Sequence, residues 1–441
     1  MVFGQIVNDR IKPVLQRIYN PLTLFVSVFV LFCNQNVFCR SIVLTPKRDL
    51  NSQVIEANVT YIIKWCFDLK GQKVKVPPQC TLYFKGGVLR NGTIVGSETR
   101  VKSDKKRVFE SIEIRGKWNN EKVYSEWLDF VEGRSFDNAF NFHNLMTLCN
   151  GRSLTHLFMQ KGVFYCSVKS NSSYIKIPSN VYWHNRATIR QLPTDSPKYS
   201  LVLLQNSNHV TIDGGVFVGD VLKHIGDKGE WGHGIKIAGA NNVVLKNLTC
   251  REFWGDGIDI IEGRYNAKTS AGEGICSNIT VDNVKCLYNR RQGISIEAGK
   301  DVLVKNSEFA YTGKYKMTEP GCGVDIEPWC RNEKKIDNIR FFNCFIHDNN
   351  PKRDFCIEAN IQYDNMKKKA SQAPVNNIMV QKCRIGKLYI HWANTVTFNN
   401  CVIEDIAHYN FAHNIIMKDC KIKELSRLRV PRGLKLERCL E

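Results

Sequence analysis

The sequence lacks several features that would place it in familiar classes of protein. The apolar run from Leu22 to Cys33 has 12 residues, whereas a membrane span needs about 20. No CxxC pair is present, so we expect no zinc site. No nucleic-acid-binding motif is present, so nucleic acid is not an expected partner. The leucine spacing of leucine-rich repeats is also absent, which argues against that kind of repeat protein.

Acidic residues are scarce relative to basic ones. The chain has 62 Lys and Arg against 42 Asp and Glu, a formal net charge of +20. An excess of positive charge favours an acidic partner, such as a uronate-containing polysaccharide, a surface glycan or lipid headgroups. The alternative is that solvated Lys and Arg side chains only cover the outer surface.

Residues 1–40 have the pattern of a signal peptide or an N-terminal anchor. Arg10, Lys12 and Arg17 give a positive start, and the short apolar run follows. Residues 37–39 lack the small side chains of a good cleavage site, so an uncleaved anchor is the alternative. In either case we expect the remainder to be exported, to a periplasmic, cell-surface or secreted location. The membrane would be contacted only through this segment, if it stays uncleaved.

The region from His233 to Glu327 repeats one pattern, in which Gly-[Ile/Val]-x-Ile is followed by a gap and a second alternating segment. Periods of 20 to 50 residues indicate stacked units, which bury one continuous core only together. The repeats begin 23, 36 and 30 residues apart, at Gly234, Gly257, Gly293 and Gly323.

Hydrophobic residues alternate within each unit as they do in a strand. In the segment Gly257 to Ile260, the two isoleucines share one face and Asp259 occupies the other. Short β-branched runs separated by Gly and Asn are typical of strands. We therefore predict an all-β protein, with a right-handed parallel β-helix over residues 131–441 and an N-terminal β-rich cap over residues 41–130.

One short helix is expected at the entry to the stack, over residues 136–148. Asp137 would cap it, and an amphipathic pattern would direct one face inward. Capping matters because an open solenoid end exposes its core and its strand edges. The inward face would consist of Phe136, Phe140, Leu145 and Leu148.

Two further residue types recur once per coil. Asn recurs at one turn position, where it is expected to form a structural ladder. Cys recurs in the later coils, where a free, buried thiol would act as a small hydrophobic residue. The Asn positions are Asn247, Asn283, Asn306, Asn343 and Asn400, and the Cys positions are Cys344, Cys383, Cys401, Cys420 and Cys439.

Aligning the repeats brings charged side chains into outward columns, about 4.8 Å apart from coil to coil. Five carboxylates then crowd three coils, and such crowding raises pKa values or recruits a cation. The alternative is that these acids only cap turns and pair with neighbouring Arg and Lys, of which Arg264, Arg290 and Arg291 are close. The columns are Lys236, Asp259, Ser295, Asp325 and Glu358; His233, Asp256 and Gln292; and Glu297 and Glu327.

Several segments resemble the pectate-lyase-like superfamily of exported, bacterial right-handed parallel β-helix proteins. Gly162 to Tyr165 is similar to its Gly-x-Tyr-like turn, and the strands after that turn have counterparts in Ser179 to Val181, Arg186 to Ile189 and His209 to Phe217. The resemblance covers roughly residues 135–441. Members include lyases, glycoside hydrolases, epimerases and phage tailspikes, so the resemblance implies the fold without selecting an activity.

The segment Trp254 to Asp259 also resembles part of the polygalacturonase-family motif. That resemblance would make Asp256 and Asp259 two catalytic acids. The family's double Asp is missing, however, because the corresponding coil reads Arg290-Arg291-Gln292-Gly293. The departure puts a true polygalacturonase mechanism in doubt.

Together these features predict cleavage of an acidic polysaccharide, by hydrolysis or by β-elimination. Asp259 and Asp325 would lie two coils apart, about 10 Å at the backbone, near the roughly 6.5–9.5 Å that separates the carboxyls of inverting glycosidases. For elimination, the base would be His233, Lys236, Arg290 or Arg291. No cofactor is required by the sequence, although Asp256, Asp259 and Asp325 could hold calcium.

Sugar-binding residues are expected beside the carboxylates. Aromatic rings stack on sugars, but packing roles are the alternative for each tryptophan. An epimerase would need the same site, and a non-catalytic glycan-binding or surface-structural β-helix is the competing hypothesis. The expected substrate-binding residues are Trp231, Trp254, Arg264, Glu327 and Trp329.

Overall fold

The structure is a computed structural model that describes residues 40–104, 106–168, 175–263, 265–266, 271–272, 274–328, 336–350, 353–358, 375–424 and 433–440. The predicted leader, Arg264 and Trp329 lie outside these ranges, so the predictions made for them stay predictions. Within these ranges no helix has the length and apolar character needed to cross a bilayer.

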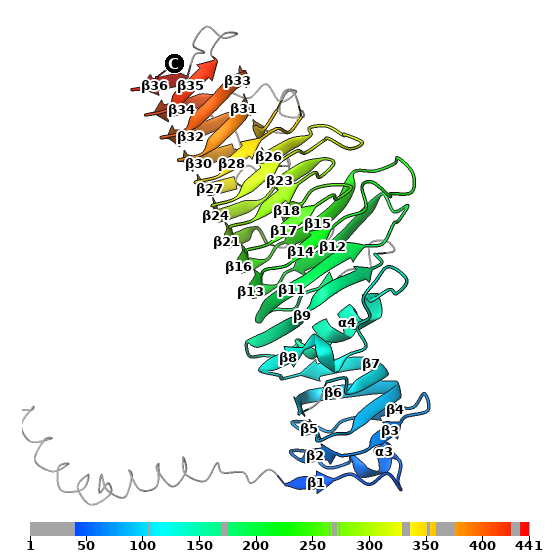
Figure 1. Cartoon of the computed structure of the whole chain (residues 1–441). Helices are drawn as coiled ribbons and strands as arrows, with labels where there is room; N and C mark the ends of the chain where they lie inside the picture. Colours follow the sequence, from blue (N-terminus) through cyan, green and yellow to red (C-terminus); the bar gives the residue numbers. More distant parts are fainter. Residues whose placement is uncertain are drawn as a thin grey trace, which may run out of the picture.

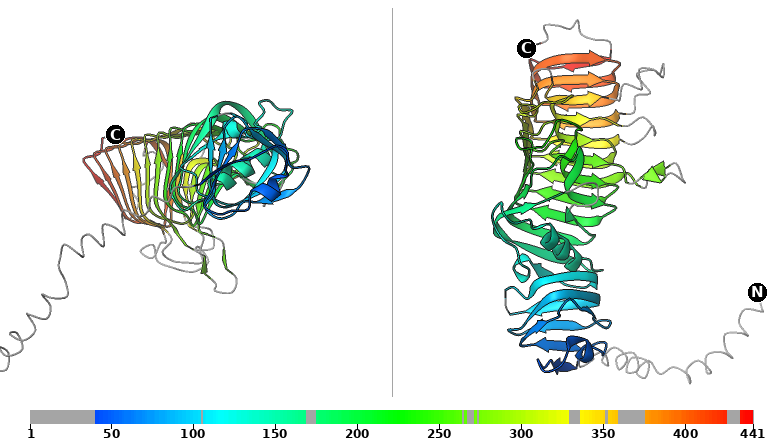
Figure 2. Two further views of the ribbon diagram at one scale, coloured as in Figure 1. Left: turned by 90° about the horizontal axis from the view of Figure 1, so that it is seen from below. Right: turned by 90° about the vertical axis from the view of Figure 1, so that its right-hand side faces the viewer.

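Residues 155–440 wind into a right-handed parallel β-helix, as the repeats predict (Figure 1). One coil consists of β15 (Trp231–Ala238), β16 (Asn241–Lys246) and β17 (Thr249–Arg251). The next coil pairs with it strand for strand and in parallel, through β18 (Ile258–Ile261), β21 (Cys276–Asp282) and β22 (Lys285–Leu287). The coils stack along one axis from the N-terminal strands to the C-terminal strands (Figure 2).

The remaining strands repeat this arrangement, apart from a small antiparallel hairpin of β19 (Tyr265–Asn266) and β20 (Ala271–Gly272). Their bounds are β8 Lys122–Tyr124, β9 Thr155–Cys166, β10 Ile175–Lys176, β11 Val181–Gln191, β12 Lys198–Gln205, β13 Asn208–Asp213, β14 Val216–Val218, β23 Gln292–Ile296, β24 Gly299–Lys305, β25 Glu308–Ala310, β26 Cys322–Ile326, β27 Ile336–Phe342, β28 Phe345–His347, β29 Phe355–Glu358, β30 Val375–Gln381, β31 Arg384–His391, β32 Ala393–Asn399, β33 Val402–Asn410, β34 His413–Lys418, β35 Lys421–Glu424 and β36 Leu434–Glu437.

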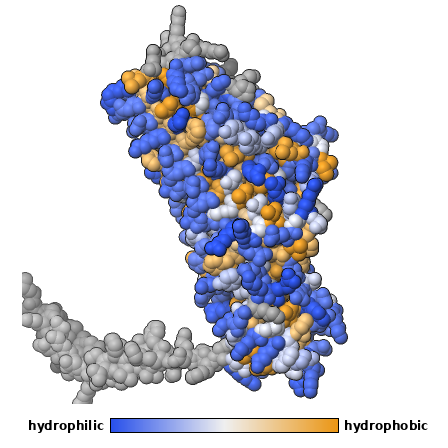
Figure 3. Space-filling view, in the orientation of Figure 1, coloured by the Kyte–Doolittle hydropathy of each residue, from blue (hydrophilic) through white to orange (hydrophobic). Residues whose placement is uncertain are grey.

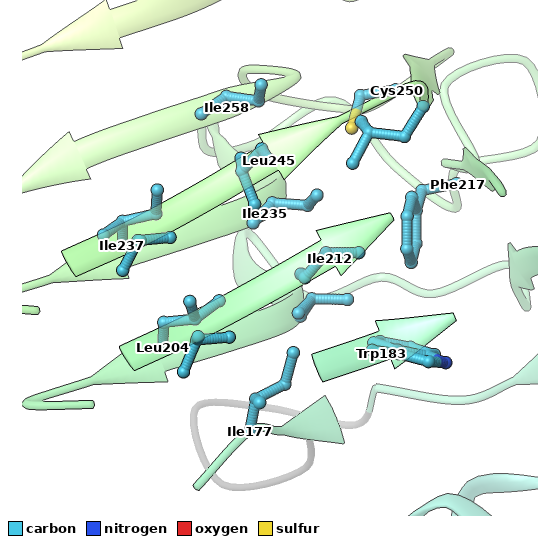
Figure 4. Close-up of a cluster of buried hydrophobic side chains, with 14 of the residues drawn as sticks. Ile177, Trp183, Leu204, Ile212, Phe217, Ile235, Ile237, Leu245, Cys250 and Ile258 are labelled. Atoms are coloured by element: carbon cyan, nitrogen blue, oxygen red, sulfur yellow. The ribbon is translucent and has the colours of Figure 1, made fainter. Parts of the chain in front are cut away.

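Inward side chains of successive coils stack into a single core. Ile235, Ile258 and Ile294 are register partners and have no exposed surface. Figure 4 shows such aliphatic side chains lying above one another, with Trp183 and Phe217 filling the wider parts. Burying each aliphatic side chain contributes about 1.5–3 kcal/mol. The outer surface in the view of Figure 3 is mainly hydrophilic, with hydrophobic residues scattered over it.

The repeated glycine has a steric cause. A Cβ atom on Gly293 would lie 2.4 Å from the carbonyl oxygen of Gly323, and one on Gly257 would lie 2.7 Å from that of Gly293. Gly234 meets Gly257 in the same way, at 2.5 Å. Glycine is therefore needed because the backbones of neighbouring coils approach closely at this column.

The Asn and Cys columns have the predicted structural roles. The five Asn residues adopt left-handed backbone angles, with φ between 52° and 57°. Asn283 Nδ2 donates to Asn247 Oδ1 at 2.9 Å, and Asn343 Nδ2 donates to Asn306 Oδ1 at 2.9 Å. All 14 described cysteines are free, and the predicted column from Cys344 to Cys420 is buried.

The N-terminal region is β-rich and has a sheet of its own. Seven strands pair in parallel in this sheet, so the region is itself built of stacked coils (Figure 1). Its elements are β1 Ser41–Val43, α3 Leu50–Gln53, β2 Thr60–Ile63, β3 Cys66–Asp68, β4 Lys73–Lys75, β5 Thr81–Phe84, β6 Val88–Ser103, β7 Phe109–Trp118 and a 3-10 helix Ser125–Trp127.

The predicted helix is α4 (Ala139–Leu148), which begins three residues later than expected. Its Asn144 side chain accepts from the Ile114 amide and donates to the Ile112 carbonyl, which joins the helix to β7. The predicted inward face was half wrong, because Phe136 and Phe140 are exposed. With the helix starting at Ala139, the buried apolar residues are Phe142, Leu145, Met146 and Leu148.

Candidate active site

The candidate site lies on the outward side of β12, β15, β18, β23, β26 and β29, which we call the first face. Strand register places Lys236 beside Asp259, Asp259 beside Ser295 and Ser295 beside Asp325, as predicted. The prediction that Glu358 is the fifth residue of this column was wrong, because Asp325 pairs with Cys356. Glu358 lies two residues further along β29, beside His391.

Asp256 and Asp259 form a buried ion-pair group with Lys236 and Arg291, and His233 lies between the two aspartates. Asp259 Oδ2 lies 2.6 Å from Lys236 Nζ and 3.6 Å from His233 Nε2. Asp256 Oδ2 lies 3.3 Å from His233 Nδ1 and 3.2 Å from Arg291 Nη1. Both aspartates have no exposed surface, and buried charges are tolerated only when they are paired in this way.

Opposite charges outweigh the effect of burial on the pKa values of Asp256 and Lys236. Burial alone would raise the pKa of Asp256, but the charges of Arg291 and His233 and a hydrogen bond from Ser295 lower it. Burial would lower the pKa of Lys236, but the charge and hydrogen bond of Asp259 raise it. Asp256 is therefore an anion and Lys236 a cation at neutral pH.

A second group of carboxylic acids lies beside the first and is biased toward the neutral form. Burial, followed by the charges of Asp259 and Glu327, raises the pKa of Glu297 well above its usual range. The pKa of Asp325 is raised by burial and by the charges of Cys322, Glu327 and Glu358. Burial also raises the pKa of Glu327. These acids lack the close cations that Asp256 and Asp259 have, with one exception.

That exception is Arg291, which links the two groups. Its Nη1 faces Asp256, and its Nη2 lies 3.0 Å from Glu327 Oε1. Gln292 adds a second link, because its Nε2 donates to Asp325 Oδ2 at 2.6 Å and to Glu327 Oε1 at 2.8 Å. Asp325 Oδ1 is buried and has no hydrogen-bond partner among the residues that the structure describes.

A cavity of about 310 Å³ opens beside the ion-pair group. His233 and Lys236 form part of its wall, so the cavity adjoins the aspartates. Trp231, which is 47% exposed, and Lys198 lie on another part of the wall. Lys198 Nζ lies 5.7 Å from the centre of the Trp231 ring, so the wall combines an aromatic face with two ammonium groups.

Two of the predicted site residues do not face the carboxylates. Arg290 donates to the carbonyls of Lys316 and Gly229, and it lies over the ring of Trp254, 3.8 Å from the ring centre. Trp254 is 1% exposed and stacks on His224 at 3.8 Å, so its ring has no face open to a sugar. Trp254 therefore has a packing role and does not stack on a sugar.

Sequence reasoning missed Lys198, because β12 precedes the first Gly-[Ile/Val]-x-Ile unit and lacks its glycine. Lys198 is the register partner of Trp231. Aligning β12 with β15 would therefore have placed Lys198 beside Trp231. Gln292 was placed in a column but given no role, since its two hydrogen bonds depend on how the side chain turns.

Calcium at Asp256, Asp259 and Asp325 stays a prediction, although the cations that hold the first two carboxylates compete with it.

Comparison with known proteins supports the fold and leaves the activity open. No family model matches the chain. The uncharacterized protein YclG of Bacillus subtilis (strain 168) is 29% identical over 183 residues, which are 40% of this chain and 31% of that protein. The SPbeta prophage-derived uncharacterized protein YorA of the same strain is 26% identical over 173 residues, 37% of this chain and 29% of that protein. The chain thus spans about three tenths of the length of these curated relatives.

Among solved structures, the A-module of the mannuronan C-5 epimerase AlgE6 of Azotobacter vinelandii is similar, with a TM-score of 0.50 and 11% identity. The match covers 72% of this chain and 98% of that module. At this identity the likeness concerns the fold alone. The parallel coils and this likeness identify the chain as a right-handed parallel β-helix protein with the fold of the pectate-lyase-like superfamily.

Proposed function

We propose that the protein cleaves an acidic, uronate-containing polysaccharide at the first face, by hydrolysis. The observation that carries the proposal is the contrast between two neighbouring carboxyls, because the pKa of Asp256 is lowered while that of Glu297 is raised well above its usual range. Environments that push the pKa values of neighbouring acids apart are what acid and base catalysis of glycosidic cleavage requires.

Glu297 and Asp259 are the proposed acid and base. The raised pKa of Glu297 favours its protonated form, and the residue is only partly buried, so it can protonate the leaving oxygen. Asp259 lies one coil and two residues away, about 8 Å at the backbone by strand spacing. Carboxyls separated by roughly 6.5–9.5 Å leave room for a water molecule, as inverting glycosidases require.

The geometry favours hydrolysis over β-elimination because the bases that elimination needs are occupied. Burial lowers the pKa values of Lys236 and Arg291, but the surrounding acidic groups raise them by more. Both side chains therefore stay protonated. His233 Nδ1 accepts from the Asp256 amide at 3.2 Å. None of these three is available to remove a proton from a sugar ring.

The cavity supports an acidic sugar as the substrate. Lys198 and Lys236 present ammonium groups beside the exposed ring of Trp231. An ammonium group pairs with a uronate carboxylate, while an aromatic ring stacks on the apolar face of a sugar. A polysaccharide substrate also agrees with the export that the N-terminal segment predicts.

The test is to incubate the purified protein with a panel of uronate-containing polysaccharides, with and without EDTA. Reducing ends and the ultraviolet absorbance of unsaturated uronates are recorded together. Hydrolysis predicts reducing ends without the absorbance. Both signals rising would indicate a lyase, and loss of activity with EDTA would support calcium. Binding without either signal would support the competing hypothesis, a non-catalytic glycan-binding protein.

A further inference from the structure

Two cysteines differ from the other buried cysteines in their location. Twelve of the described cysteines are buried, and ten of these belong to the hydrophobic interior. Cys322 and Cys356 are also without exposed surface, yet they are not part of that core. They lie on the first face instead, where Cys322 pairs with Gln292 and Cys356 pairs with Asp325. Filling the interior therefore does not explain these two thiols.

The two thiols converge on one carboxylate. The Sγ atoms of Cys322 and Cys356 and a carboxylate oxygen of Asp325 all lie within 4.8 Å of one another. Gln292 Nε2 binds Asp325 Oδ2 at 2.6 Å, which fixes the orientation of the carboxylate. The other oxygen, Oδ1, is fully buried and has no hydrogen-bond partner in the described part of the chain. A buried oxygen without a partner is costly, so this arrangement is expected to receive a further ligand.

We propose that Cys322, Cys356 and Asp325 bind a zinc ion. Two sulfurs and one oxygen are a donor set that zinc accepts, whereas calcium and magnesium take oxygen ligands alone. Ligand atoms around a tetrahedral zinc ion lie about 3.3–3.8 Å apart, as follows from Zn–O and Zn–S distances of about 2.0–2.3 Å. The three donors, which lie within 4.8 Å of one another, would move closer by side-chain rotation to reach this spacing.

A fourth ligand is available on the same face. Glu358, Glu327 and Asp325 form a second group whose oxygens lie within 4.8 Å of one another. Glu327 is held by Arg291 and Gln292 at 3.0 and 2.8 Å, while the contacts of Glu358 with Arg353 are longer, at 3.4 and 3.5 Å. Glu358 is thus the carboxylate that is freer to complete the coordination. Gln292 then acts in the second shell, by orienting Asp325.

The site would join two coils independently of any substrate. Cys322 and Asp325 belong to β26, and Cys356 belongs to β29 of the next coil. The metal ion would therefore cross-link two neighbouring coils. The proposal does not rest on the proposed cleavage, and its test needs no substrate.

The first measurement is the zinc content of the full-length protein, purified from zinc-supplemented culture without chelators, together with Cys322→Ala and Cys356→Ala. Cys250→Ala and Cys286→Ala are matched controls, because these thiols are also register partners on neighbouring coils but belong to the hydrophobic core. A single zinc per chain is expected in the wild type and in the controls, and it should be lost in both test variants. Zinc that persists in Cys322→Ala, or a wild type that binds none, overturns the proposal.

A second measurement needs no variant and covers the case in which a substitution prevents folding. Zinc is replaced by cobalt in the wild type, and the absorption spectrum is recorded. Thiolate ligation predicts an intense sulfur-to-cobalt charge-transfer band together with the visible bands of tetrahedral cobalt. Absence of the charge-transfer band contradicts the proposal. A Cys322–Cys356 disulfide in the isolated protein, detected by mass spectrometry without reduction, contradicts it equally.

Discussion

Asp256 and Glu297 are carboxylic acids on neighbouring coils of the same face, yet their surroundings favour opposite charge states. Asp256 meets Arg291 and His233, whereas Glu297 is buried among other acids. Aligning the repeats placed both residues in outward columns, since equivalent positions of successive coils stack on one another. It did not identify which acid meets which cation, since that depends on how a long side chain such as Arg291 turns.

The raised pKa of Glu297 makes a prediction about stability. The folded state binds this proton more tightly than the unfolded chain, so this residue's contribution to stability falls as pH rises from about 4.3 through the raised pKa. Glu297→Gln removes the ionisation, and its stability relative to the wild type should increase between about pH 5 and about pH 8. Urea unfolding at the two pH values measures the difference.

Glu113→Gln is the control for this experiment. A hydrogen bond from Arg115 lowers the pKa of Glu113, so its ionised form stabilises the fold above the unfolded pKa. Because that ionisation is complete above the unfolded pKa of about 4.3, the stability of this control relative to the wild type should stay nearly constant between about pH 5 and about pH 8. Equal pH dependence in Glu297→Gln and the wild type would mean that Glu297 is ionised in the folded protein.

Lys198 provides a prediction about substrate binding. Its ammonium group lies in the cavity wall, away from the proposed acid and base, so it should bind the ground state and the transition state alike. Loss of one charge-assisted hydrogen bond, about 1.5 kcal/mol, should raise KM roughly tenfold in Lys198→Ala with little change in kcat. Lys246→Ala, on another face beside Asp213, is the matched control. A fall in kcat with unchanged KM would contradict this role.

At the scale of the strand, the repeated glycine is the most informative feature of the sequence. It predicted the register from β15 to β26 because each glycine marks the same close approach between coils. The prediction failed at β29, whose sequence Phe-Cys-Ile-Glu has no glycine, and so Glu358 was placed where Cys356 lies. Without the steric marker, alternation alone does not decide between positions two residues apart.

The close approach predicts that Gly293→Ala is destabilising. The added Cβ would meet backbone atoms of Gly323, which cannot move without separating the coils. We expect a loss of about 1–3 kcal/mol or more in the free energy of unfolding, as for overpacked cores. Lys300→Ala, at an exposed position of β24, should change it by less than about 0.5 kcal/mol. A neutral Gly293→Ala would show that the coils are further apart than described.

The Asn ladder allows its two contributions to be separated. Asn283 has φ of 54° and donates to Asn247. Asn283→Ala loses both the hydrogen bond and the tolerance of left-handed backbone, at a cost of about 1–2 kcal/mol. Asn283→Gly keeps the backbone freedom and should cost less. Chemical denaturation of both variants measures these losses of stability. An Asn283→Ala variant that is more stable than Asn283→Gly would contradict the account.

At the scale of the molecule, the repeats were sufficient to predict the stacked architecture but not the chemistry. The site assembles from residues between Lys198 and Glu358, which come together only because coils stack in register. Outward residues are free to vary on this scaffold, so the fold carries many activities. The cavity beside Trp231 was not predicted, because its walls combine residues of β12, β15 and β18, and the repeat pattern does not reveal the space between their side chains.

The central claim, that the first face cleaves an acidic polysaccharide, is tested most directly by comparing two Lys–Asp pairs. Asp259 pairs with Lys236 at the site, and Asp213 pairs with Lys246 on another face. Initial rates of reducing-end release are measured on the uronate polysaccharide that the wild type degrades fastest. Asp259→Asn should lower the rate by about 10²-fold or more, and Asp213→Asn should retain it. Equal rates for Asp259→Asn and the wild type, or a wild type inactive on every polyuronate, would contradict the claim.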